Sequence, residues 1–68
     1  MIIHVNGQPR EVVPPIRLSD VLDLLEGATT PRGVAVAVNG EVIPRSRHAG
    51  TELTEGARVE IVKAVQGG

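Results

Sequence analysis

The most informative segment of the sequence reads VAVAVNGEVI and covers residues 34–43. Valine and alanine alternate through its first half, which places the larger side chains on one face of a strand and the smaller ones on the other. The Asn39-Gly40 dipeptide that follows suits the positive φ angles of a tight hairpin turn. The segment therefore predicts two antiparallel strands, and we expect the valine face of the first strand to pack in the core.

A second hairpin is predicted at the start of the chain. Residues 2–5 are rich in β-branched side chains, and Asn6-Gly7 suits a turn of the same kind. Residues 10–13 would return antiparallel to this first strand. We expect Pro9 at the start of the returning strand, because proline cannot donate a ladder hydrogen bond.

A short helix is predicted after this hairpin. Its aliphatic residues have the i, i+3, i+4, i+7 spacing of one helix face, and they are Leu18, Val21, Leu22 and Leu25. Ser19 is a candidate N-cap, and Gly27 suits the left-handed position just past the end. A helix of about two turns is marginal alone, so its apolar face must dock on a sheet.

The rest of the chain reads as a polar segment and a final strand. Residues 45–55 carry Leu53 as their only large aliphatic side chain, so we expect a loop with at most one helical turn or a short strand. Residues 58–65 begin with polar and apolar side chains in alternation and end apolar on both sides. Such a strand is usually central in its sheet.

The order of elements is hairpin, helix, hairpin, loop and strand. A right-handed crossover through the helix lets the last strand lie beside the first and parallel to it. This order predicts an α+β fold of the β-grasp, or ubiquitin-like, type, with a four- to five-stranded mixed sheet and one crossing helix. We expect a single domain over residues 1–68, with residues 65–68 as a flexible C-terminal tail.

The composition excludes several classes of function. The 68 residues include no cysteine and no aromatic residue, and the formal net charge is −1. Without cysteine there is no disulfide, no thiolate nucleophile and no thiolate metal site. Without aromatic residues or excess positive charge, nucleic-acid binding is not expected. His4 and His48 stand apart at no recognisable ligand spacing, so we expect no metal site.

No membrane segment or secretion signal is evident. The longest uninterrupted apolar run, residues 33–38, is far shorter than the roughly 20 residues of a membrane helix. The N-terminus lacks the basic region and long apolar stretch of a signal peptide. We therefore expect a cytoplasmic protein that does not bind membranes.

No pattern typical of a catalytic site is present, which leaves the C-terminal residues Val65-Gln66-Gly67-Gly68 as the candidate site. One interpretation is simply a frayed chain end. The other is chemical, because glycines lack Cβ atoms and can lie extended in a narrow slot with the final carboxylate accessible from both sides. ATP-dependent adenylation by another protein would make that carboxylate an acyl donor. Both interpretations stay open on the tail alone.

Two long segments of the chain closely resemble the thiamine-biosynthesis sulfur carrier family (ThiS). They are VAVAVNGEVIPR, residues 34–45, and GARVEIVKAVQGG, residues 56–68. The resemblance covers essentially the whole chain, because residues 1–7 and 18–25 also occupy the expected places. One departure is His48, where the family commonly carries an aromatic residue.

The resemblance implies a carrier that acts with two enzymes and is not itself an enzyme. A ThiF-type, ubiquitin-activating-like adenylyltransferase would use ATP to adenylate the Gly68 carboxylate, and a sulfur donor would convert it to a thiocarboxylate. A ThiG-type thiazole synthase would then take the sulfur for the thiazole ring of thiamine. Gly67 would leave the Gly68 carboxylate sterically accessible, and both partner enzymes would bind Gln66 and Val65 along the tail. The resemblance implies no catalytic residue, no metal and no cofactor bound by this chain.

Three other interpretations remain. The molybdopterin synthase small subunit has the same fold and Gly-Gly end, and a carrier for sulfur-containing amino acid synthesis would work in the same way. A β-grasp protein-binding module would have an inactive tail. For any carrier, one short helix cannot cover both faces of the sheet, so we expect the open face to expose aliphatic side chains and to contact the partners.

Overall fold

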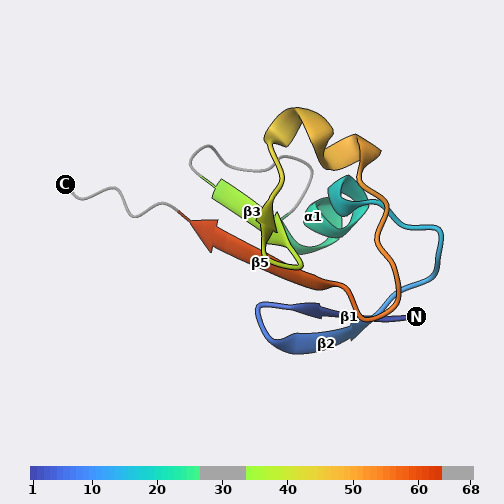
Figure 1. Ribbon diagram of the computed structural model, residues 1–68. Helices are drawn as coiled ribbons and strands as arrows, with labels where there is room; N and C mark the ends of the chain where they lie inside the picture. The colour runs from blue at the N-terminus through green and yellow to red at the C-terminus, as the bar shows by residue number, and fades with distance from the viewer. Residues whose placement is uncertain (27–33, 64–68) are drawn as a thin grey trace.

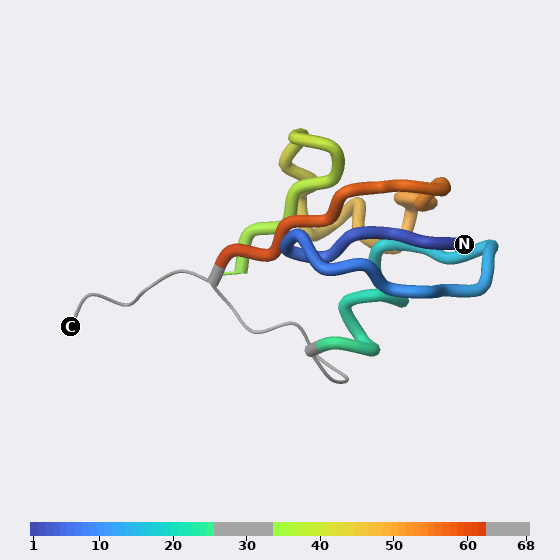
Figure 2. Tube along the Cα trace, turned by 90° about the horizontal axis from the view of Figure 1, so that it is seen from below, coloured from blue at the N-terminus to red at the C-terminus, as the bar shows by residue number. Residues whose placement is uncertain are grey.

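The computed structural model describes residues 1–26 and 34–63. Along the chain the elements are β1 (Ile2–Val5), β2 (Gln8–Glu11), α1 (Leu18–Glu26), β3 (Val34–Val38), β4 (Glu41–Val42), the 3-10 helix η1 (Arg45–Gly50) and β5 (Arg58–Lys63). Figure 1 shows β5 between β1 and β3, and Figure 2 shows α1 on one side of the layer formed by β1, β2 and β5.

The strands form one mixed sheet in the order β2-β1-β5-β3-β4. β1 and β5 are parallel, with His4 opposite Arg58 and Val5 opposite Val59. The other neighbouring strands are antiparallel. This arrangement confirms the predicted β-grasp fold, including the central position of the last strand.

The core lies between α1 and the sheet. Leu18 and Leu22 of the helix and Val36 and Val59 of the sheet are fully buried. The i, i+3, i+4, i+7 spacing is thus confirmed as the packed helix face. On β3, Val36 is buried and Val34 and Val38 pack against the core, whereas Ala35 is exposed. The expectation that the valine face packs inward is confirmed as well.

The two predicted Asn-Gly turns are present, and both of them hold β5. Asn6 and Asn39 have φ angles of 50° and 52°, and the glycines after them have φ angles of 82° and 85°. The Asn6 side-chain Oδ1 accepts a hydrogen bond from the Ile61 N–H at 2.8 Å. Asn39 Oδ1 accepts one from the Arg58 N–H at 2.9 Å. Each turn therefore fixes the central strand as well as its own hairpin.

The returning strand of the first hairpin begins earlier than predicted. β2 spans Gln8–Glu11 rather than residues 10–13, because the two-residue turn pairs Val5 with Gln8 directly. Pro9 is the second residue of β2 and lies opposite His4. In an antiparallel ladder every second residue turns its nitrogen outward, and β2 is an edge strand, so the missing N–H of Pro9 breaks no ladder bond.

The prediction of Ser19 as the N-cap is wrong. The helix begins at Leu18, so Ser19 lies within its first turn. Asp20 contacts the chain at this helix start instead: its Oδ2 accepts a hydrogen bond from the Arg17 N–H at 2.9 Å. The Leu18 N–H donates to the Thr51 carbonyl at 2.8 Å, so a distant segment satisfies part of the helix start. Gly27, the predicted stop, lies outside the described residues.

The polar segment is more structured than predicted. The six-residue helix η1 exceeds the single turn that we expected, since a 3-10 helix has about three residues per turn. His48 within it is 7% exposed, and its Nε2 lies 3.0 Å from the Ile43 carbonyl oxygen. Leu53 is buried as well. The segment folds because these side chains enter the core, although its overall composition is polar.

Candidate functional site

The strand that precedes the predicted tail is the central strand of the sheet. β5 is described as far as Lys63, where it pairs with Val34 of β3. The remainder of the predicted strand, Ala64 and Val65, lies outside the described residues. So do Gln66, Gly67 and Gly68, and with Val65 these complete the predicted tail site. The part of β5 that the structure describes exposes Arg58, Glu60 and Val62 on one face of the sheet.

That surface, which we call the open face, is the side of the sheet opposite α1. On β1, β3 and β5 its side chains alternate with those that face the core. The residues of the open face are Ile2, His4, Pro9, Glu11, Ala35, Ala37, Val42, Arg58, Glu60 and Val62. On β5 the order from Arg58 through Glu60 to Val62 runs from a charged half of the open face to an apolar half.

The apolar half lies around the end of β5. Val62 is 60% exposed and lies opposite Ala35, and Val42 is 68% exposed and lies opposite Ala37. We call these four residues the apolar patch. They confirm the expectation that the open face exposes aliphatic side chains. Large exposed apolar groups clustered on one face often mark a protein interaction site.

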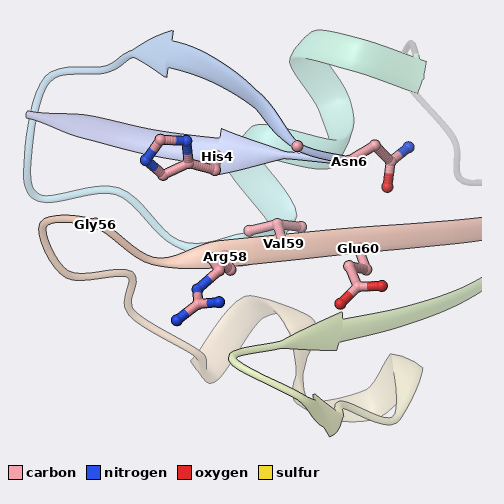
Figure 3. A pocket seen from close by; sticks show the side chains of 7 residues that line it. His4, Asn6, Gly56, Arg58, Val59 and Glu60 are labelled. Carbon is pink, nitrogen blue, oxygen red and sulfur yellow. The ribbon is translucent and has the colours of Figure 1, made fainter.

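The charged half lies over the junction of β1 and β5. His4 and Arg58 are directly opposite in the parallel register. With Asn6, Gly56 and Glu60 they line a surface hollow, and Figure 3 shows the side chains of His4, Arg58 and Glu60 around it. The guanidinium of Arg58 points toward the Gly56 end of the hollow and away from Glu60 (Figure 3).

The described part of the chain contains neither a cluster of metal-ligating side chains nor a helix that could span a membrane. In residues 1–26 and 34–63, no three His, Cys, Asp or Glu side chains come together in a way that could hold a metal ion. His48 is enclosed in the core, whereas His4 lies on the open face. Within the same ranges no helix is long and apolar enough to cross a membrane.

The sequence predicted an open face but did not assign residues to it. The sequence shows Arg58 and Glu60 only as polar positions of an alternating strand, and His4 only as a histidine at no recognisable ligand spacing. The sequence signal that could have identified these residues is the alternation along the strand. Val59 and Ile61 point inward, so Arg58, Glu60 and Val62 must lie on the opposite face. Placing His4 beside Arg58 requires the parallel register of β1 and β5, which is a tertiary property.

Comparison with known proteins agrees with the resemblance to the ThiS family that the sequence shows. The sequence model of the ThiS family matches residues 3–68. The crystal structure of a thiamine biosynthesis protein (ThiS) from Geobacter metallireducens is similar over 100% of both chains, with 31% sequence identity and a TM-score of 0.82. The solution NMR structure of a thiamine biosynthesis protein from the same organism has 29% identity and a TM-score of 0.76, over 100% of this chain and 88% of that one. No curated protein sequence matches the chain.

Proposed function

The chain belongs to the ThiS family, and from this membership we propose that it is a sulfur carrier for thiamine synthesis whose Gly68 carboxylate holds the sulfur. The observation that carries the proposal is the family match, which extends from residue 3 to the Gly67-Gly68 end of the chain. The similarity to ThiS structures favours thiamine over the molybdopterin and amino-acid alternatives.

The proposed chemistry takes place at one main-chain carboxylate and uses two partner enzymes. In the ThiF-type adenylyltransferase, a carboxylate oxygen of Gly68 attacks the α-phosphorus of ATP, pyrophosphate leaves, and an acyl-adenylate forms. Hydrosulfide from the sulfur source then attacks the carbonyl carbon, AMP leaves with the oxygen, and loss of the S–H proton gives the thiocarboxylate. The thiocarboxylate delivers its sulfur to the thiazole ring in the ThiG-type thiazole synthase. This chain contributes the acyl group and the means of recognition.

The composition supports a carboxylate as the group that holds sulfur. The chain has no cysteine, so a cysteine persulfide cannot form on it. Glycine at the last two positions places no Cβ beside the reacting carbonyl carbon, so the adenylate and the sulfur nucleophile can approach it from either face. Val65 and Gln66 would provide the side chains by which the partners hold the tail.

Intact-mass measurement tests the proposed function. The purified chain is incubated with ATP, a sulfur source and the ThiF-type adenylyltransferase of the organism that encodes it. Replacing one oxygen by sulfur should raise the mass by about 16 Da. Omission of ATP should prevent the increase, because the carboxylate is unreactive until it is adenylated. An unchanged mass, with an adenylyltransferase that loads another carrier under the same conditions, would contradict the proposal.

We also propose that the apolar patch docks on the adenylyltransferase, because it lies beside the end of β5 and is exposed. Val62→Glu should then raise the KM for the carrier by about tenfold or more, since an interface that covers Val62 would have to desolvate a carboxylate. The kcat should change little, because the reacting carboxylate is unaltered.

Leu24→Glu is the matched control for this prediction. Leu24 is 74% exposed and lies on α1, on the other side of the molecule from the open face. The same charge introduced there should leave the KM within about twofold of the wild-type value. Initial rates of pyrophosphate release give both constants. Equal KM values for the two variants would rule out docking through the apolar patch.

A further inference from the structure

Within residues 1–26 and 34–63, the charged half of the open face holds an arginine whose guanidinium has no partner. Arg58 is exposed, and its guanidinium makes no hydrogen bond or ion pair with any other residue of the described part of the chain. Glu60 lies two residues away on the same face, yet the Arg58 side chain is directed away from it (Figure 3). A guanidinium is always charged and presents a planar set of donors that fits a carboxylate.

The size of the open face decides whether a partner that covers the apolar patch also covers Arg58. Five strands about 4.8 Å apart give a width of about 20 Å, and strands of at most six residues give a length of about 20 Å. The resulting area of about 400 Å² is roughly half of what one partner buries in a standard interface. Arg58 and Val62 are only about 13 Å apart along β5. A partner seated on Val62 therefore lies over Arg58 as well.

Covering Arg58 has an electrostatic consequence for the partner. A guanidinium removed from water without a counter-charge is strongly unfavourable, whereas a bidentate pair with a carboxylate compensates for much of the lost hydration. His4, directly opposite Arg58, supplies a ring N–H that can donate to the same carboxylate. The hollow between β1 and β5 leaves space for an incoming side chain.

We propose that Arg58, with His4, is the docking site for an aspartate or glutamate side chain on the surface of the adenylyltransferase. This inference rests on the proposed function, because it takes the adenylyltransferase as the partner on the open face. The partner surface that fits has an apolar centre for Val62 and, about 13 Å away, an acidic side chain for Arg58. The pair would fix how the carrier is oriented on the enzyme.

Binding measured without ATP tests this site. Calorimetric titration of the ThiF-type adenylyltransferase should give a Kd for Arg58→Glu at least about tenfold above that of the wild type, because two carboxylates then face each other. Arg58→Lys keeps the charge but loses the bidentate geometry, so its Kd should lie between the two. Far-ultraviolet circular dichroism shows whether each variant is folded.

Arg10→Glu is the matched control, because it makes the same change of charge elsewhere on the sheet. Arg10 is exposed on β2 and lies opposite the buried Ile3, so it belongs to the α1 side of the sheet. Its Kd should stay within about twofold of the wild-type value. Equal Kd values for Arg58→Glu and Arg10→Glu would overturn the inference, and so would a wild type that does not bind at all. A rise in the KM for ATP alone would assign Arg58 to the nucleotide and would also overturn it.

This experiment separates the failure of the docking site from the failure of the proposed function. A wild-type chain that binds the enzyme but gains no mass with ATP would refute sulfur loading. The difference between Arg58→Glu and Arg10→Glu would still decide the docking site in that case. Conversely, a chain that gains about 16 Da while both variants bind equally well would support the function and refute the site.

Discussion

Deletion of Gly68 should abolish thiocarboxylate formation. The shortened chain still ends in a carboxylate, but that carboxylate lies one residue, or about 3.5 Å, short of the position that the wild-type carboxylate reaches. A misplacement of about 1 Å between reacting groups can lower a rate by about a hundredfold, so we expect a loss of at least a thousandfold. The rate of the mass increase of about 16 Da measures the effect.

A second variant distinguishes the position of the terminal carboxylate from the steric access to its carbon. Gly68→Ala keeps the carboxylate at the same distance along the chain but places a Cβ beside the reacting carbon. It should therefore be loaded more slowly than the wild type and much faster than the deletion variant. The deletion should leave the thermal midpoint unchanged, because every buried core residue of the described part precedes Lys63. A deletion variant that is loaded at the wild-type rate would contradict the role of Gly68.

Replacing Leu22 by alanine should destabilise the domain by about 3 to 5 kcal/mol. Leu22 is only 1% exposed and lies on the face of α1 that packs against the sheet, so the substitution leaves a cavity between the two layers. A domain of this size has a total stability of only about 3 to 5 kcal/mol from its core. We therefore expect the Leu22→Ala variant to be largely unfolded at room temperature.

Leu24→Ala provides the comparison on the same helix, because Leu24 is 74% exposed. Its free energy of unfolding should change by no more than about 0.5 kcal/mol. Urea denaturation is best followed by far-ultraviolet circular dichroism, because the chain has no tryptophan, tyrosine or phenylalanine for fluorescence. Equal urea midpoints for the two variants would show that the packing of α1 does not hold the domain together.

The features that were predicted well depend on local sequence. The φ angles that an Asn-Gly turn needs are a property of those two residues, so both turns were located correctly. The alternation in residues 34–38 and the spacing of Leu18, Val21 and Leu22 depend on burial of one face, and the core follows both patterns. The central position of the last strand followed from its apolar end.

The features that were predicted wrongly depend on contacts between distant segments. The start of the helix is satisfied partly by the Thr51 carbonyl, which no local pattern around Ser19 reveals. The segment of residues 45–55 reads as a loop by composition, but His48 enters the core, where its Nε2–H donates a hydrogen bond to the Ile43 carbonyl oxygen. This contact exists only once the chain is folded.

The candidate site likewise has one part that the local sequence predicts and one part that depends on contacts between distant segments. The Gly67-Gly68 end was visible in the sequence, because glycine has a specific steric effect wherever it stands. The open face was expected in general terms, since one helix covers one side of a sheet. Its particular residues were not, because the pairing of His4 with Arg58 and of Ala35 with Val62 is set by the register of three strands.

The most direct test of the account is to locate the sulfur within the loaded chain. Fragmentation of the product in the mass spectrometer gives a series of C-terminal fragments, and the smallest one contains only the last residue. We expect the additional mass of about 16 Da in every fragment that contains Gly68 and in no fragment that lacks it. Additional mass on fragments without Gly68, or no additional mass after turnover of ATP, would contradict the claim that this carboxylate carries the sulfur.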